Sequence, residues 1–168
     1  VIGAAHAQHQ REVMPLKIID TLRSMKAMTL GFAADQLSHQ LIAGTLARRA
    51  GASDEQIVAA LCHDIGKVLS IPNHGPIAAE MMKPYVSDEV YYTIYYHQHF
   101  QGAYYYNFAG MPTDMRMKFK DEPWFGFACK LVDEWDAPAF DPDFPVDSLE
   151  SFEPEITRVF SAPKRMIV

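Results

Sequence analysis

Apolar residues recur along most of the chain at intervals of three and four, the spacing of one face of an α-helix. No stretch alternates between apolar and polar residues in the way a half-buried strand does. The spacing predicts helices over 15–28, 35–50, 54–66, about 76–83, from Ser87 past His97, over 113–119 and 123–136, and within 147–160. Residues 104–110 are predicted to form a loop, and the last residues to be loose. We therefore predict an all-α helical bundle.

Residues typical of helix ends support these boundaries. Ser53 followed by Gln56 forms a capping-box pattern, in which each side chain bonds the other's backbone N–H. Gly51 suits the end of the preceding helix, and Gly66 is expected to end the helix that Ser53 starts. Pro123 suits the first position of the helix over 123–136.

Length and composition favour one domain. With 168 residues and 49% hydrophobic content, the chain can bury a single core, and we expect one domain over 1–168 with its motif-bearing part at about 35–145. A net charge of −6 with scattered basic residues argues against nucleic acid as a partner. We also expect no membrane span or signal peptide, and two cysteines favour a reducing cytoplasm. The expected partner is a small-molecule substrate, and the expected state is a monomer or homodimer.

Histidines and aspartates stand at helical positions where metal ligands could converge. Asp64 falls on the apolar face of its helix, where a carboxylate is costly unless it is paired or bound to a cation. The adjacent His63 points about 100° away on a helix. Imidazoles and carboxylates together suit one or two divalent or trivalent metals. The candidate set, in chain order, is His39, His63, Asp64, His74, His97 and a late aspartate.

Several of these positions have a plainer interpretation. A lone histidine is usually structural, and His6 and His9 keep that interpretation. Asp133 and Asp136 are three residues apart and lie on nearly the same helix face, so spacing alone does not choose between them as the late ligand. His99 would point away from His97 and could act behind the ligands or on the substrate. Cys62 is expected to be a small buried residue.

The motifs resemble those of the HD-domain superfamily, whose first members are metal-dependent phosphohydrolases. His74 and His97 narrow the resemblance to the dinuclear HD proteins. HDIGKVL at 63–69 and IYYHQHF at 94–100 are similar to segments of the myo-inositol oxygenases. EPWFGFACKLVDEWDAPAF at 122–140 resembles their final-aspartate segment, and its Trp-Asp step is also typical of the phosphonate-cleaving HD oxygenases. This register makes Asp136 the last ligand.

The resemblance implies a mixed-valent Fe(II)/Fe(III) pair with O2 as co-substrate. His39, His63, Asp64 and Asp136 would hold one iron, and His74, His97 and the shared Asp64 the other. The implied oxidoreductase, a dioxygenase, cleaves a C–P or C–C bond beside a hydroxyl-bearing carbon. Its substrate would be a polyol or a hydroxy-phosphonate, with or without a trimethylammonium group, as in phosphonate catabolism. The alternative is a dinuclear phosphohydrolase acting on a small phosphate ester or nucleotide. A non-catalytic module is disfavoured because all six ligand positions are filled.

Residues around the ligand set are candidates for substrate contacts. Lys67 matches a substrate-contacting lysine of the inositol oxygenases, although a solvated lysine at a helix C-terminus is equally favoured. Gln101 and Asp133 stand where the phosphonate oxygenases carry basic residues, and 29–32 lacks their Tyr and Glu. The loop between Lys67 and His74 is shorter than in the inositol oxygenases. Tyrosines gather on both sides of His97. Core packing is the main interpretation, and an aromatic cage for a quaternary ammonium or amine group is the sharper one. The residues are Tyr91, Tyr92, Tyr95, Tyr96, Tyr104, Tyr105 and Tyr106.

Overall fold

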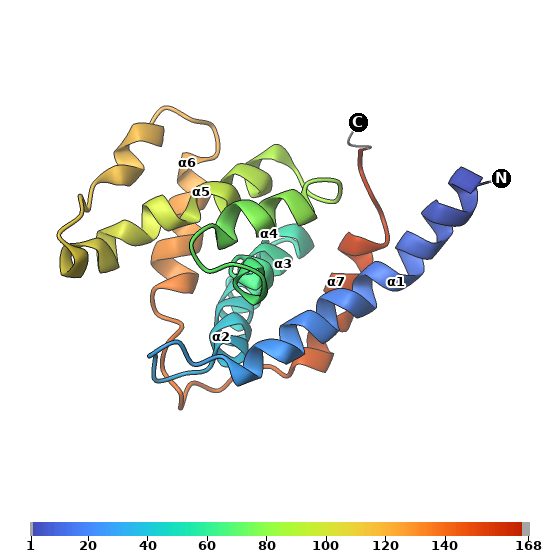
Figure 1. Cartoon of the computed structure of the whole chain (residues 1–168), viewed down its shortest axis with the longest axis horizontal. Helices are drawn as coiled ribbons and strands as arrows, with labels where there is room; N and C mark the ends of the chain where they lie inside the picture. The colour runs from blue at the N-terminus through green and yellow to red at the C-terminus, as the bar shows by residue number, and fades with distance from the viewer. Residues whose placement is uncertain (1, 166–168) are drawn as a thin grey trace.

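The computed structural model describes residues 2–165 and shows an all-helical chain without strands in that range. Helices α2 (Gln36–Arg49), α3 (Asp54–Cys62), α4 (His74–Met82) and α5 (Asp88–Tyr105) form the centre (Figure 1). In the described part, α2 packs on α3, and α4 packs on α5. No helix of residues 2–165 combines the length and apolar character needed to cross a membrane. The predicted all-α bundle is confirmed.

The predicted helix starts at Ser53 and Ser87 are confirmed. The Ser53 hydroxyl accepts from the Gln56 N–H, and the Gln56 side chain returns to the Ser53 N–H, so the capping box is complete. The Ser87 hydroxyl accepts from the Val90 N–H at the start of α5. Helix α2 begins in the same way at Asp35. These caps fix where three of the four central helices enter the bundle.

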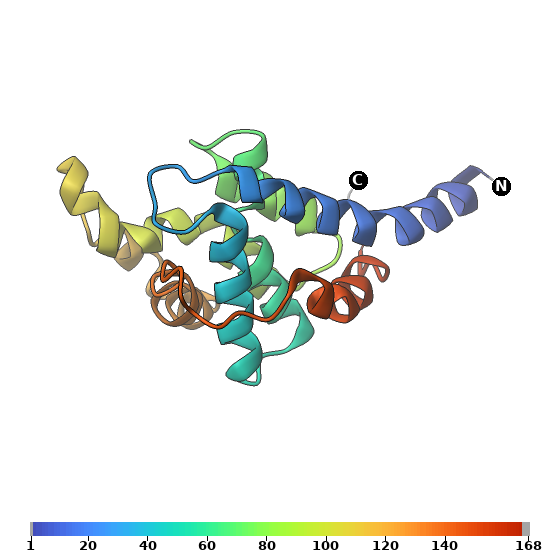
Figure 2. The ribbon, with the colours of Figure 1, turned by 90° about the horizontal axis from the view of Figure 1, so that it is seen from below.

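Two more helices lie at the side of this centre. Helix α1 (Ile2–Ser24) runs past it to a short 3-10 turn, η1 (Met25–Ala27), and its first half projects from the molecule (Figures 1 and 2). Helix α7 (Glu153–Phe160), preceded by η6 (Leu149–Phe152), packs on both α1 and α3. The sequence predicts a helix only from residue 15, because residues 2–12 have no buried face: all of them are exposed. The predicted loose C-terminal end falls in large part on 166–168, outside the described residues.

Several elements begin, end or coil differently from the sequence prediction. The helix predicted over 54–66 ends at Cys62, and a separate 3-10 helix, η2 (Ile65–Val68), follows it. Helix α5 extends to Tyr105 and is followed by η3 (Tyr106–Ala109), where a loop over 104–110 is predicted. The segment predicted over 113–119 is the 3-10 helix η4 (Met115–Phe119). The helix predicted to start at Pro123 begins two residues later, as α6 (Phe125–Lys130).

A π-helical turn, η5 (Leu131–Asp136), follows α6 and packs on α2. Its wider turn is marked by the bond from the Ala137 N–H to the Val132 oxygen, five residues back. The widening separates the two late acids. Asp136 is fully buried, whereas the Asp133 side chain is 35% exposed. The expectation that they share a face, which assumes α-helical geometry, is therefore wrong.

The core contains an unusual number of polar side chains. Most of it is aliphatic and aromatic, with Leu22, Ile42, Ile94 and Phe100 fully buried or nearly so. Among residues 2–165, ten polar or charged residues are buried, and six of them are the histidines and aspartates that the sequence singles out: His39, His63, Asp64, His74, His97 and Asp136. Buried groups of this kind are costly unless paired or bound to a cation, so the centre of the bundle is where a functional site is expected.

Candidate metal centre

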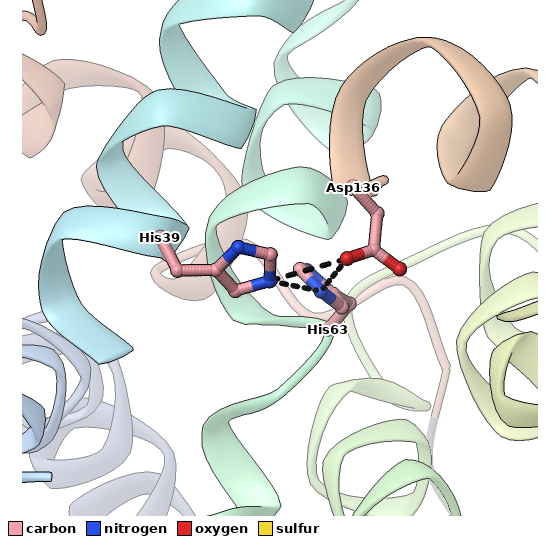
Figure 3. A group of neighbouring side chains, drawn as sticks. All are labelled: His39, His63 and Asp136. Atoms are coloured by element: carbon pink, nitrogen blue, oxygen red, sulfur yellow. Dashed lines mark hydrogen bonds and ion pairs between the residues drawn. The ribbon is translucent and has the colours of Figure 1, made fainter. Parts of the chain in front are cut away.

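Five segments of the chain bring the six residues together: α2, the junction between α3 and η2, α4, α5 and η5. His39 lies within α2, His63 directly follows α3, and Asp64 precedes η2. The others come from the first residue of α4, the middle of α5 and the last residue of η5. Figure 3 shows His39, His63 and Asp136 pointing toward one another from three different segments. None of the six is more than 5% exposed.

All four imidazoles are oriented in the same way. Each places its Nδ1 within hydrogen-bond distance of a backbone carbonyl oxygen, and a carbonyl can only accept. These contacts are His39 to Ala139 at 3.0 Å, His63 to Ala60 at 2.8 Å, His74 to Ile71 at 2.7 Å and His97 to Ile94 at 2.7 Å. The proton of each neutral ring is therefore on Nδ1, and the lone pair is on Nε2. Metal-binding histidines are commonly held like this.

The first group of donors consists of His39, His63 and Asp136. The Nε2 atoms of His39 and His63 are 3.3 Å apart, and they lie 3.1 Å and 3.3 Å from Asp136 Oδ1. That oxygen is buried without a hydrogen-bond donor among the described residues. Three electron-rich atoms thus meet in a dry space, where they repel one another unless a cation lies between them. The residues fit a bound metal ion.

Asp64 joins this group to a second one. Its Oδ2 lies 3.5 Å from His39 Nε2 and 3.6 Å from His63 Nε2. Its Oδ1 lies 2.9 Å from His74 Nε2 and 3.3 Å from His97 Nε2, and those two nitrogens are 3.1 Å apart. Donor atoms of His63, Asp64 and His97 also fall within 4.8 Å of one another, so the two groups are contiguous. One carboxylate thus directs each oxygen to a different histidine pair.

The electrostatics of the centre favour positive charge. Burial by itself lowers the pKa of His39, but its close contacts with the carboxylates of Asp136 and Asp64 outweigh burial and raise it to about 9. Burial likewise raises the pKa of both carboxyls, yet the neighbouring imidazoles, His63 first, bring those pKa values below their usual range. Both acids are therefore ionised, and without a metal a proton on His39 balances part of their charge.

Lys67 and Gln101 hold the two carboxylates in place. Lys67 Nζ donates to Asp64 Oδ2 at 2.5 Å and to Gln36 Oε1 at 2.9 Å, and its side chain is only 10% exposed. The interpretation of Lys67 as a solvated residue is therefore wrong. Gln101 Nε2 donates to Asp136 Oδ2 at 2.7 Å, which leaves Oδ1 facing the histidines. Gln101, expected to contact substrate, is thus in direct contact with a candidate ligand.

Aromatic rings cover the His39 side of the centre. Phe140 stacks on the His39 ring with 4.2 Å between centroids, and Phe32 stacks on Phe140 at 4.5 Å. Tyr105 packs edge-on against both phenylalanines. Burial, followed by the charges of Asp136 and Asp64, raises the pKa of Tyr105 to about 12, so its hydroxyl is protonated and close enough to feel both acids. Phe32 is 39% exposed and forms the outer end of the stack.

The remaining predicted substrate residues lie elsewhere. Asp133 accepts from the two terminal nitrogens of Arg116, Nη1 and Nη2, at 2.9 Å and 3.0 Å, and from the Tyr104 hydroxyl at 2.8 Å. His99 packs against the rings of Tyr96 and Phe119. None of these residues has a hydrogen bond or ion pair to the six candidate ligands within residues 2–165. The tyrosines therefore do not form one cage around His97.

Three residues that contact the candidate ligands or their neighbours were not predicted from the sequence. Gln36, the partner of Lys67, is fully buried but stands in the first turn of its helix, where polar residues are common. Phe140 follows a proline-containing segment in which no periodicity reveals its position. Arg116 lies in a short 3-10 helix and compensates the charge of Asp133. The only available signal was the charge of Asp133, which calls for a basic partner.

Comparison with known families agrees with this geometry. The family model of the HD domain matches residues 37–137, a range that contains all six candidate ligands and more than half of the chain. A search of curated proteins finds no match. The clustered histidines and aspartates can bind metal, as the family implies. The chain belongs to the HD-domain family.

Proposed function

We propose that this chain is a diiron oxygenase, which uses O2 to cleave a C–C or C–P bond next to a hydroxyl-bearing carbon of a small metabolite. His39, His63, Asp64 and Asp136 would hold one iron, and His74, His97 and Asp64 the other. An iron pair bound there supplies one-electron redox chemistry and activates O2.

The observation that carries the proposal is the position of Asp64. Its two oxygens face different histidine pairs, His39 with His63 and His74 with His97, as a carboxylate that bridges two cations must. A single metal would leave the Nε2 lone pairs of the other two histidines facing each other in a dry interior, at 3.3 Å for His39 and His63 or 3.1 Å for His74 and His97. Two metals satisfy every donor of the set.

The donor types support iron. His74, His97 and Asp64 make a two-histidine, one-carboxylate group, the combination typical of non-haem iron sites that activate O2 and keep coordination positions open. Over the whole centre, four neutral imidazoles accompany only two carboxylates. A low ligand charge suits an ion pair that changes oxidation state during turnover.

The surrounding residues have roles that follow from their contacts. Lys67 carries a positive charge beside Asp64 Oδ2 and can donate to a substrate oxygen bound at the same metal pair. Gln101 fixes Asp136 so that Oδ1 stays directed at the first metal position. Phe140 and Phe32 exclude water from the His39 side. Arg116 is paired with Asp133, away from the six candidate ligands, whereas Lys67 lies beside Asp64 and, after its bonds to Asp64 and Gln36, keeps a third ammonium N–H for a substrate oxygen.

A dinuclear phosphohydrolase is the alternative function. HD domains are usually metal-dependent hydrolases or related enzymes, and a carboxylate-bridged pair of metals can also activate water against phosphorus. The two functions differ in what they require: the hydrolase works with a redox-inert metal and without O2.

The test compares iron-loaded with zinc-loaded protein. O2 uptake is measured with an oxygen electrode over a panel of polyols and hydroxy-phosphonates, and phosphate release from phosphate esters is measured without O2. The proposal predicts substrate-dependent O2 uptake for the iron protein alone, lost in His74→Ala and kept in His9→Ala, a histidine on the exposed half of α1. Phosphate-ester hydrolysis that the zinc protein supports equally, with no O2 uptake, would establish the hydrolase.

A further inference from the structure

A cavity of about 480 Å³ lies beside the start of α5, between that helix and the segment that joins η4 to α6. None of the six candidate metal ligands lines it. Its volume falls in the range of small-molecule sites. Its lining residues are Asp88, Glu89, Tyr92, Tyr96, Phe119, Glu122, Pro123 and Trp124.

Four aromatic rings make up one wall of this cavity. Trp124 is nearly parallel to Tyr96, at 12° with centroids 5.5 Å apart, and to Tyr92, at 23° and 5.9 Å. Phe119 packs against both Tyr96 and Trp124. Tyr92 is the most accessible part of the wall, with 40% of its surface exposed. Ring faces attract cations through the negative charge of their π systems.

The polar residues of the lining are acidic. Asp88 accepts from Arg165 at 2.6 Å, so its charge is compensated. Glu89 and Glu122 have no ion pair within residues 2–165 and leave two negative charges at the cavity. No lysine, arginine or histidine lines it. Its charge therefore repels anions such as phosphates and phosphonates.

The cavity does not suit a metal ion. The described residues contain two groups of donors close enough together to hold a metal, and both belong to the HD centre. The aromatic wall supplies no ligand for a hard cation. Aromatic faces combined with carboxylates instead match an organic cation, whose alkyl groups can pack on the rings while its charge meets the acids.

We propose that this cavity binds a small organic cation of the quaternary ammonium or methylated amine class. The site is separate from the metal centre, so the proposal holds whichever reaction the metals catalyse. It narrows the aromatic cage that the sequence suggested for the tyrosines around His97 to Tyr92 and Tyr96, together with Trp124.

The probe for the test is choline, compared with its neutral analogue in which a tert-butyl group replaces the trimethylammonium group. Binding to the full chain is followed by NMR through the indole N–H of Trp124, one of only two tryptophans, with ionic strength held constant. Choline should shift this signal saturably, and the neutral analogue should bind at least several-fold more weakly. Raising the salt concentration should weaken choline binding.

Two variant pairs locate the bound cation. Tyr92→Leu should raise the choline Kd about two- to five-fold, the range of an exposed cation–π contact. Its control is Tyr104→Leu, on the same helix and equally exposed at 41%. Glu122→Gln should raise Kd about two- to five-fold at low salt, whereas Glu153→Gln, an exposed acid of α7, should not. Equal affinity for the neutral analogue, a Trp124 signal that choline never moves, or a loss confined to Tyr104→Leu would each overturn the proposal.

Discussion

Gly66 lies in η2, two residues after Asp64, and its backbone packs directly against that of His74. Substituting it with alanine tests whether this close packing positions His74 beside Asp64. A Cβ at this position would lie 2.2 Å from the backbone oxygen of His74 and 2.9 Å from its carbonyl carbon. Gly66 is not among the glycines with positive φ, so space and not backbone conformation excludes a side chain. The obstacle is backbone, which cannot rotate away. Gly66→Ala must therefore displace the His74 backbone relative to Gly66 and disturb the placement of the His74 ring beside Asp64.

The size of the effect follows from these distances. Cβ atoms essentially never approach other atoms closer than 3.0 Å, so the His74 backbone must move by about 0.8 Å. This movement acts on a contact of 2.9 Å between His74 Nε2 and Asp64 Oδ1. Overpacking of this kind costs about 1–3 kcal/mol. In a chain of this length the melting temperature should fall by about 2–12 °C, and the second metal position should lose affinity.

The assay combines calorimetric melting of the metal-free protein with metal analysis of the loaded protein. The control is Gly126→Ala in α6, where an added Cβ meets nothing within 4 Å. That variant should keep the metal content and melt at the same temperature or slightly higher, since alanine favours helix more than glycine. If Gly66→Ala matched the wild type in both melting temperature and metal content, the proposed packing of η2 against His74 would be refuted.

Three further predictions follow from the site. His74→Ala should reduce the metal content from two ions to one per chain, measured by elemental mass spectrometry, while His6→Ala leaves it unchanged; full loading of His74→Ala would contradict the assignment. Gln101→Leu removes the donor to Asp136 Oδ2 and should weaken metal binding about 10- to 100-fold in a competition titration, with Gln8→Leu on exposed α1 as control. Burial raises the pKa of the fully buried Cys62, so a thiol reagent should modify only Cys129 in the native protein. Both cysteines should react in guanidinium. Rapid reaction of Cys62 in the native protein would show that the core opens.

Local rules predicted much of this fold. Ser53 and Ser87 start their helices because their hydroxyls satisfy nearby backbone N–H groups, and this depends only on neighbouring residues. The apolar face that carries Asp64 also pointed inward as expected, since its periodicity is local. The six residues singled out by type and order are the ones that converge in the structure.

What the sequence did not predict depends on distant contacts or irregular turns. The first half of α1 has no buried face, so periodicity gives no signal there. The π-helical turn η5 places Asp136 inside and Asp133 outside, whereas an α-helical projection puts them only about 60° apart. Lys67 is recognisable as buried only when Gln36, 31 residues away, is placed beside it. The tyrosines on both sides of His97 separate because Tyr92 and Tyr96 face Trp124, whereas Tyr104 bonds Asp133.

The most direct test of the central claim is electron paramagnetic resonance of the iron-loaded wild-type protein, partly reduced without O2. Two irons bridged by Asp64 should give a coupled mixed-valence signal with an average g value below that of the free electron, and a substrate bound at the pair should shift it. Full iron loading with only the signal of isolated ferric ions would contradict both the bridge and the proposed oxygenase.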